Sequence, residues 1–388
     1  MLNRFFCLSF IFISTIAVAQ KDTSEYPNYR NKIKDQSFFL KMNPKNTDAL
    51  LKRSFYEQAI GDYKASVADL TTLLELKPDD HRAWNSRAVA KHALTDHKGA
   101  IEDYAKAISL QPNFIDAYYG RALVYAEIKD LKAALDDLNK TIAVDPRFTL
   151  AINGRADIKN EQGDLKGAIE DYSKSLSINS NDNAALYGRA KAYYDLKEFK
   201  AALDDYNTLL QIDHDPKMEV KYYLGKGFIQ NELGLYNEAI ASFNKALQLD
   251  PANAKAYNNR GMAKYYLNQH KEALLDMNKA VELDPNYPQA YNKRGDTKMV
   301  LKDFKGALVD LNRSIELDPN NASAYNNRGA AKIALKDYKG AVEDFTRSIE
   351  LLKDNSQAYA NRAIAYEELG EKQKAKEDKE IAKQLSKK

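Results

Sequence analysis

The sequence predicts an all-α array of tandem helical hairpins, an α-solenoid, rather than one compact globular domain. A spacing of 34 residues separates Tyr257, Tyr291 and Tyr325, and each of these tyrosines opens a similar stretch of sequence. The length of 388 residues exceeds what a single hydrophobic core ordinarily needs. Only 16 glycines and 10 prolines are present, so the chain is neither linker-rich nor disordered.

The repeat keeps one phase along most of the chain, with Tyr257 at position 4 of its unit. The ten units are 47–80, 81–114, 115–148, 149–182, 183–219, 220–253, 254–287, 288–321, 322–355 and 356–388. Aromatic residues recur at positions 4 and 24, small residues at 8, alanine at 20 and proline at 32. The small residues let two helices approach closely, and proline ends the second helix. One hairpin cannot bury its apolar surface alone, whereas stacked neighbours do.

A period of 34 residues with this pattern resembles the tetratricopeptide repeat family, from about residue 47 to the end of the chain. The resemblance implies a right-handed superhelix of ten helix–turn–helix hairpins, whose first helices line a concave, peptide-holding groove. We expect segment 20–46 to form an N-terminal capping helix. The fifth and sixth units are 37 residues apart, with the extra residues around 214–217, which predicts a longer loop and a weak point there.

Residues 1–19 have the features of a secretory signal peptide. Arg4 precedes the apolar stretch from Phe5 to Val18, and small residues at 17 and 19 precede Gln20. The alternative, an uncleaved membrane anchor, needs a span of about 20 apolar residues, and this stretch is shorter. Cleavage removes Cys7, the single cysteine, so the mature chain would have no disulfide. We therefore expect an exported protein, periplasmic, surface-associated or secreted, with no stable membrane insertion.

Position 7 is arginine and position 23 is aspartate in nine units, while the sixth unit has Lys226 and Ser242. Because both residues are lost together, the two positions are expected to touch within a hairpin. The predicted structural ion pairs include Arg155–Asp171, Arg260–Asp276, Arg294–Asp310 and Arg328–Asp344. The alternative is a row of arginines that binds an anionic ligand, although each arginine has a matching carboxylate.

No pattern for catalysis, a cofactor or a metal ion stands out in the sequence. The chain has no glycine-rich phosphate loop and no nucleophile elbow. The five histidines occupy different repeat positions, and we expect His92 and His97 to lie on different faces. Without cysteine in the mature chain or a carboxylate–histidine cluster, we predict no metal site. The charge is nearly balanced at +3, which indicates no nucleic-acid partner.

Two tracks of side chains mark the first helices. Position 6 is Gly120, Gly154, Gly188 and Gly225 in the third to sixth units. Glycine inside a helix costs about 1 kcal/mol relative to alanine, so a neighbouring helix or a ligand backbone is expected to approach closely. By the resemblance these positions face the groove, and the predicted peptide-binding residues are Asn258, Asn259, Asn292, Asn326, Asn327, Asn361, Tyr119, Tyr187 and Tyr194. Alternatively, glycine only permits packing and asparagine only solvates the surface.

The resemblance implies a scaffold for protein–protein interaction, with a protein or peptide partner bound in the groove and no enzymatic activity. A second hypothesis is a structural spacer or assembly subunit of a cell-envelope complex that binds through its convex face. A third, favoured only by the tyrosines, is a carbohydrate-binding or enzymatic role.

Overall fold

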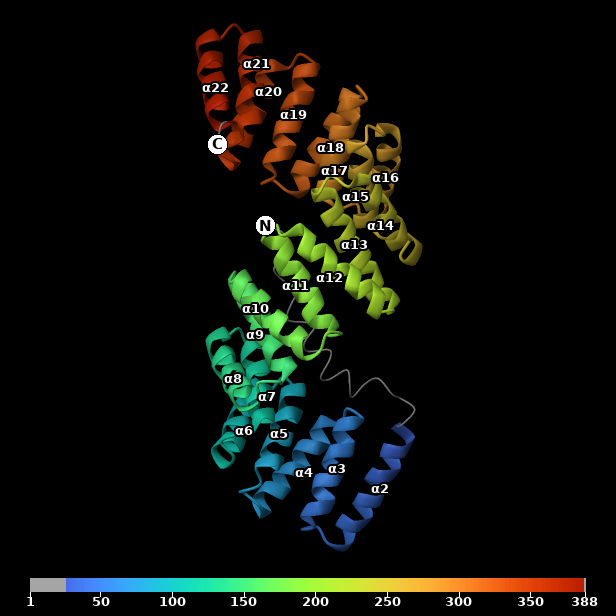
Figure 1. Ribbon diagram of the computed structural model, residues 1–388, viewed down its shortest axis with the longest axis vertical. Helices are drawn as coiled ribbons and strands as arrows, with labels where there is room; N and C mark the ends of the chain where they lie inside the picture. The colour runs from blue at the N-terminus through green and yellow to red at the C-terminus, as the bar shows by residue number, and fades with distance from the viewer. Residues whose placement is uncertain (1–25, 387–388) are drawn as a thin grey trace. The chain divides into compact units, whose positions relative to one another are not determined.

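The computed structural model describes residues 26–386, which form 21 helices and, within that range, no strand. Helix α2 (Tyr26–Met42) is followed by ten pairs of helices (Figure 1); nine pairs pack as hairpins, and the Arg189–Asp205 ion pair joins the two helices of the other. The prediction of an all-α fold of tandem hairpins is confirmed. The predicted signal peptide, 1–19, lies outside the described residues. Between residues 26 and 386, no helix combines the length and the apolar character needed to cross a membrane.

The hairpins are α3 (Thr47–Ala59) with α4 (Tyr63–Leu76), α5 (His81–Ala93) with α6 (His97–Leu110), α7 (Ile115–Glu127) with α8 (Leu131–Val144), α9 (Thr149–Gln162) with α10 (Leu165–Ile178), α11 (Asn183–Asp195) with α12 (Phe199–Ile212), α13 (Pro216–Glu232) with α14 (Tyr236–Leu249), α15 (Ala254–Tyr266) with α16 (His270–Leu283), α17 (Pro288–Val300) with α18 (Phe304–Leu317), α19 (Ala322–Ala334) with α20 (Tyr338–Leu351), and α21 (Ser356–Glu368) with α22 (Lys372–Leu385). They form two compact units, divided in the sequence between Asp205 and Tyr206.

The turn inside each hairpin depends on two neighbouring positions. Position 15 has a positive φ in all ten hairpins, with glycine in four of them and Thr95, Lys129, Lys197, Asn268, Lys302 or Lys336 in the others. Position 16 is the N-cap of the second helix, and six aspartates there accept a hydrogen bond from the backbone amide three residues later. The left-handed residue reverses the chain, and the aspartate starts the new helix.

The core lies between the two helices of each hairpin and between neighbouring hairpins. Alanine at position 20 is at most 2% exposed in its nine occurrences, which lets the helices cross closely. Position 24 inserts a large side chain beside it, such as Tyr104, Phe243 or Phe345, each at most 1% exposed. Full burial of one such side chain stabilises the fold by about 1.5–3 kcal/mol. Each hairpin therefore depends on its neighbour for part of its core.

Helix α2 takes the place of the second helix of a preceding hairpin. It packs against α3, and Leu40 is buried there. The Ser37 hydroxyl accepts a hydrogen bond from Arg53 Nη1 at 3.1 Å. Thr71 of α4 accepts the same bond from Arg87 at 3.2 Å. Because the arginine makes the same contact in both places, α2 imitates a repeat helix on the front of the array.

The prediction of a longer loop around 214–217 was wrong. Helix α12 ends at Ile212 and α13 begins at Pro216, so only three residues connect them, whereas four connect α4 to α5. The additional residues lengthen α13 to 17 residues instead of 13. Asp215 caps this helix through Lys217 N, and proline at its first position has the φ that a helix requires. The insertion therefore extends a helix by one turn and does not lengthen the loop.

Candidate functional site

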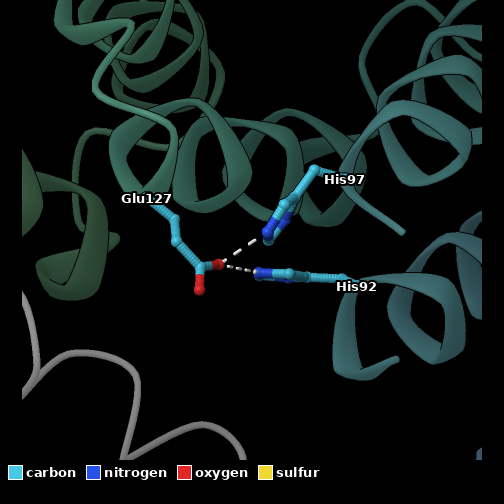
Figure 2. Close-up of side chains that lie close together, drawn as sticks. All are labelled: His92, His97 and Glu127. Atoms are coloured by element: carbon cyan, nitrogen blue, oxygen red, sulfur yellow. Dashed lines mark hydrogen bonds and ion pairs between the residues drawn. The ribbon is translucent and has the colours of Figure 1, made fainter. Parts of the chain in front are cut away.

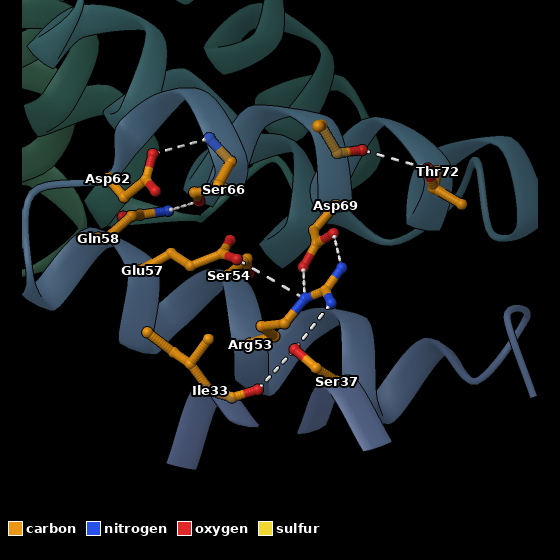
Figure 3. A network of polar contacts seen from close by, with 12 residues as sticks. Ile33, Ser37, Arg53, Ser54, Glu57, Gln58, Asp62, Ser66, Asp69 and Thr72 are labelled. Carbon is orange, nitrogen blue, oxygen red and sulfur yellow. Dashed lines mark hydrogen bonds and ion pairs between the residues drawn. The ribbon is translucent and has the colours of Figure 1, made fainter. Parts of the chain in front are cut away.

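The arginine at position 7 and the aspartate at position 23 meet across the two helices of nine hairpins. In the first hairpin, Arg53 binds Asp69 through two parallel hydrogen bonds of 2.6 Å (Figure 3). In the fourth, Arg155 Nη2 lies 2.6 Å from Asp171 Oδ1. The other pairs are Arg87–Asp103, Arg121–Asp137, Arg189–Asp205, Arg260–Asp276, Arg294–Asp310, Arg328–Asp344 and Arg362–Asp378, all within 2.5–2.7 Å.

Eight of the nine arginines also bond the helix that precedes their hairpin; Arg121 is the exception, because position 25 of the hairpin before it is Ala105. Nη1 donates to the side chain at position 25 of the preceding hairpin, as Arg155 does to Asn139 at 2.8 Å. The same bond links Arg260 to Asn244 and Arg328 to Asn312. The nine arginine side chains are 13–24% exposed, and the aspartates 1–8%. With both ends of the guanidinium engaged, this Arg–Asp ladder is structural, which disfavours a row of arginines for an anionic ligand.

Position 11, which the sequence analysis did not single out, completes the ladder. Lysine at this position binds the same aspartate at 2.7–2.8 Å in five hairpins, through Lys91, Lys159, Lys264, Lys298 and Lys332. In three others a tyrosine ring at position 11 lies 5.7–5.8 Å from the arginine. A lysine or tyrosine four positions after eight of the nine arginines, on the same helix face, was the available signal; Glu57 follows Arg53.

The sixth hairpin replaces the charged set with a neutral one. Gln230 stands at position 11 and accepts a hydrogen bond of 2.6 Å from the Ser242 hydroxyl. Both residues are buried. A buried carboxylate without its arginine would be strongly destabilising, so the loss of arginine and the loss of aspartate accompany each other.

Two ladder carboxylates with different residues at position 11 have pKa values shifted in opposite directions. Burial raises the pKa of Asp171, but hydrogen bonds from Arg155 and Lys159 outweigh it, and the pKa falls below its usual value. Asp205 has Arg189 but no lysine, and burial raises its pKa. In the first hairpin Glu57 replaces the lysine, and burial with the nearby Asp69 charge raises the Glu57 pKa to about 7.

The predicted glycine track accommodates tyrosine rings of the preceding hairpin. A Cβ on Gly120 would approach the Tyr104 ring to 2.6 Å, and a Cβ on Gly188 would overlap the ring of Tyr172. Gly225 is related to Tyr206 in the same way. Gly154 faces Leu138 instead and has room for a methyl group. Close approach of a neighbouring helix therefore accounts for three of these glycines.

The predicted asparagines mostly bond one another rather than lie open on the surface. Asn258, Asn259 and Asn292 are only 2–5% exposed, while Asn326, Asn327 and Asn361 are half-buried. The Asn327 amide donates to Asn292 Oδ1 at 3.0 Å, and Asn361 donates to Asn326 Oδ1 at 3.1 Å. Position 6 of one hairpin thus binds position 5 of the hairpin before it. This Asn ladder holds first helices together, which neither reading of the sequence anticipated.

The predicted tyrosines occupy three different environments. Tyr119 is 6% exposed and packs against Phe148, with ring centroids 5.2 Å apart. The Tyr187 ring lies 5.8 Å from Lys191 Nζ. Tyr194 is 37% exposed and packs against Phe199. Of the three, Tyr194 is the most exposed.

Position 5 of the first helices carries side-chain oxygens that are buried without a hydrogen-bond partner. They are Asn85 Oδ1, the Tyr119 hydroxyl, Asn153 Oδ1 and Asn258 Oδ1. Buried polar groups are nearly always hydrogen-bonded, so a repeated exception at one position needs an explanation. In the first compact unit, Asn153 lies one helical turn before Asp157, whose carboxylate accepts from the Tyr172 hydroxyl. Burial raises the Asp157 pKa to about 7.

The expectation that His92 and His97 lie on different faces was wrong. Their rings are 5.9 Å apart, and Glu127 of the next hairpin lies beside both. His92 ends the first helix and His97 starts the second, and the turn through Thr95 brings them together. Helical spacing alone does not apply across such a turn, so the sequence argument missed a carboxylate–histidine cluster.

Comparison with protein families agrees with this repeat geometry. A TPR repeat model matches residues 96–129, 156–197, 227–267 and 296–335. One tetratricopeptide repeat model matches residues 254–287. A second matches residues 115–148 and 322–355. The matches together cover more than half of the chain. The chain belongs to the tetratricopeptide repeat family. Its hairpins are tetratricopeptide repeats, and the repeat family supports a role as a protein-interaction scaffold.

One solved structure shows the same fold. A tetratricopeptide repeat protein from Parabacteroides merdae ATCC 43184 is 20% identical, with a TM-score of 0.54 over 65% of this chain and 98% of its own. MamA (41-end) from Desulfovibrio magneticus RS-1 is 18% identical and matches 44% of this chain and 96% of its own, with a TM-score of 0.40. No curated protein sequence matches the chain.

Proposed function

We propose that this tetratricopeptide repeat protein is an exported scaffold that holds a protein or peptide segment against its first helices. Its family supports the interaction role, and in that family the first helices line the concave side. The signal-peptide features of residues 1–19 support export. The proposed partner is a protein rather than a nucleic acid, because the net charge is only +3.

The unpartnered oxygens at position 5 carry the proposal. They occur in both compact units, on first helices in each case, at Asn85, Tyr119, Asn153 and Asn258. An extended peptide presents backbone N–H groups at regular intervals, and amide or phenol oxygens accept hydrogen bonds from such groups. Because these oxygens are buried in the free chain, neighbouring side chains must move aside before a bound backbone can supply the partners that the folded chain lacks. The exposed ring of Tyr194 adds an apolar surface on the same set of helices.

Exposed apolar side chains on the second helices favour the second candidate, assembly through the opposite face. Leu275 and Val309 occupy the same position in neighbouring hairpins and are 69% and 68% exposed. Exposed apolar patches often mark protein-binding surfaces. A spacer or assembly subunit of an envelope complex would use these residues.

Site-specific photo-crosslinking distinguishes the two faces. A photoreactive phenylalanine derivative at Tyr194 should crosslink an envelope partner, whereas the same group at Leu275 should not. Crosslinks from Leu275 alone would overturn the first-helix proposal in favour of assembly through the second helices.

A conservative pair of variants tests the position-5 oxygens once the crosslinked partner is available. Tyr119→Phe removes a hydroxyl that has no partner within the chain, so the melting temperature should hold while partner affinity falls. Tyr172→Phe is the control, because its hydroxyl already donates to Asp157. That variant should lose stability rather than a direct contact with the partner. Unchanged affinity in Tyr119→Phe would contradict the proposed role of this oxygen.

A further inference from the structure

His92, His97 and Glu127 form a compact cluster at the junction of the second and third hairpins (Figure 2). His92 Nε2 lies 2.9 Å from Glu127 Oε2, and His97 Nδ1 lies 3.7 Å from the same oxygen. One nitrogen or oxygen from each residue lies within 4.8 Å of the other two. The three side chains come from the end of α5, the start of α6 and the end of α7.

The spacing of the three atoms fits a common metal centre. Two ligands of a tetrahedral Zn²⁺ ion, each about 2.0–2.1 Å from the metal, are about 3.3 Å apart. The distances from Glu127 Oε2 to His92 Nε2 and to His97 Nδ1, 2.9 and 3.7 Å, lie on either side of this value, and one ligand atom from each residue lies within 4.8 Å of the others. Two imidazoles and one carboxylate also form an established zinc ligand set, which leaves a fourth position for water.

The cluster leaves hydrogen-bonding capacity unused in the folded chain. His97 Nδ1 is buried and has no hydrogen-bond partner, because 3.7 Å to Glu127 is too long for one. The nearby cations are engaged elsewhere. Lys129 binds Glu161 at 2.8 Å, and Lys91 binds Asp103 at the same distance. A cation between the three side chains would use the free imidazole nitrogen and neutralise the carboxylate.

We propose that His92, His97 and Glu127 bind a divalent transition-metal ion of the Zn²⁺ class, with water as the fourth ligand. The ion fastens the turn of the second hairpin to the end of the third hairpin's first helix. Three protein ligands from two repeats make the site a clip between neighbours, independent of whatever the first helices hold.

The seventh hairpin supplies a matched control. His270 occupies the same repeat position as His97, and its Nδ1 is also buried without a partner. Its neighbour in the place of His92 is Tyr265, with ring centroids 5.1 Å apart. Val300 occupies the place of Glu127 in the following hairpin. This junction keeps the imidazole of His270 but has no counterpart of His92 or Glu127, and the carboxylate near His270 is that of Asp296.

The test titrates Zn²⁺ into the tag-free chain after removal of metal with a chelator, measured by calorimetry and by competition with a chromogenic chelator. One equivalent should bind, and Co²⁺ should give the intense visible absorption of a four-coordinate site. Loss of even an outer-shell partner weakens metal binding about 10–100-fold, so His97→Ala and Glu127→Gln should each weaken it at least as much. His270→Ala should bind as the wild type does.

Melting temperatures keep the test independent of folding defects. Zn²⁺ should raise the melting temperature of the wild type and of His270→Ala, because a ligand that binds only the folded state stabilises it. The same ion should leave the melting temperature of Glu127→Gln unchanged. Circular dichroism without metal should show the wild type and all variants equally helical. Absence of stoichiometric binding in the wild type, or undiminished binding in both ligand variants, would overturn the proposal.

Discussion

Glu57 lies 3.6 Å from Arg53 in the first hairpin. Five other hairpins have a lysine at this repeat position, and that lysine binds the ladder aspartate. In the first hairpin the arginine therefore faces two carboxylates, Glu57 and Asp69, without a second cation (Figure 3). Burial and the Asp69 charge raise the Glu57 pKa to about 7. The first hairpin departs from a rule that the other eight Arg–Asp hairpins follow, lysine or tyrosine at position 11.

Glu57→Lys should stabilise the first hairpin by restoring that rule. The gain should be on the order of 1 kcal/mol, as for an ion pair near the surface. Urea denaturation at pH 8 measures it. Glu57→Gln separates the two contributions, because it removes the repulsion without adding a cation. If neither variant is more stable than the wild type, Glu57 does not destabilise the first hairpin.

The same glutamate should make stability depend on pH in a defined direction. Its pKa is raised from an ordinary 4.5 to about 7, so between these values the folded chain holds a proton that the unfolded chain releases. Stability from this group is therefore complete below about pH 4.5 and is lost as the pH rises through 7. The advantage of Glu57→Gln over wild type should be larger at pH 8 than at pH 5. An equal difference at both values would contradict the raised pKa.

Breaking the Arg–Asp ladder should destabilise far more than breaking a surface pair. Asp310 is 1% exposed and binds both Arg294 and Lys298. Asp310→Asn leaves two buried cations without their anion, which should cost about 3–5 kcal/mol. The control is Glu316→Gln, whose exposed pair with Arg313 should be worth less than about 1 kcal/mol. Denaturation curves that rank the two variants equally would refute a structural ladder.

Lys293→Asn should extend the Asn ladder by one rung. Asn327 and Asn361 each donate to position 5 of the preceding hairpin. Asn258 Oδ1 has no partner, and the donor position opposite it is occupied by Lys293. A new hydrogen bond there should add about 0.5–1.5 kcal/mol. Lys293→Ala is the control, and an equal gain in it would attribute the effect to loss of the lysine.

Two glycines at the same repeat position should respond to alanine in opposite directions. In Gly188→Ala the new methyl group overlaps the Tyr172 ring, so we expect a loss of about 1–3 kcal/mol from overpacking. In Gly154→Ala the nearest atom is Leu138 Cδ2 at 3.5 Å, so the higher helix propensity of alanine should add up to about 1 kcal/mol. Thermal denaturation of both variants tests this, and a shift of the same sign in both would be inconsistent with the packing described.

The fold class follows from the order of amino acids alone, because a period of 34 residues is a property of the chain that no tertiary contact alters. Alanine at position 20 and an aromatic or aliphatic residue at position 24 repeat with the helices they join, so the hairpins were predictable. The joint absence of arginine and aspartate in the sixth repeat likewise indicated that positions 7 and 23 touch. Each of these inferences uses residues at the same position in many repeats.

Side-chain contacts between repeats and across turns follow from the tertiary structure and not from the periodicity. Asn292 and Asn327 are 35 residues apart and bond through a lateral contact that helical periodicity does not encode. His92 and His97 meet because the chain reverses at Thr95, where a helical wheel no longer applies. Residues 216–219 extend α13 because Asp215 caps it, although the spacing alone indicated a loop. Periodicity fixes which residues share a helix face, whereas side-chain direction, turn geometry and the adjacent repeat decide what each residue touches.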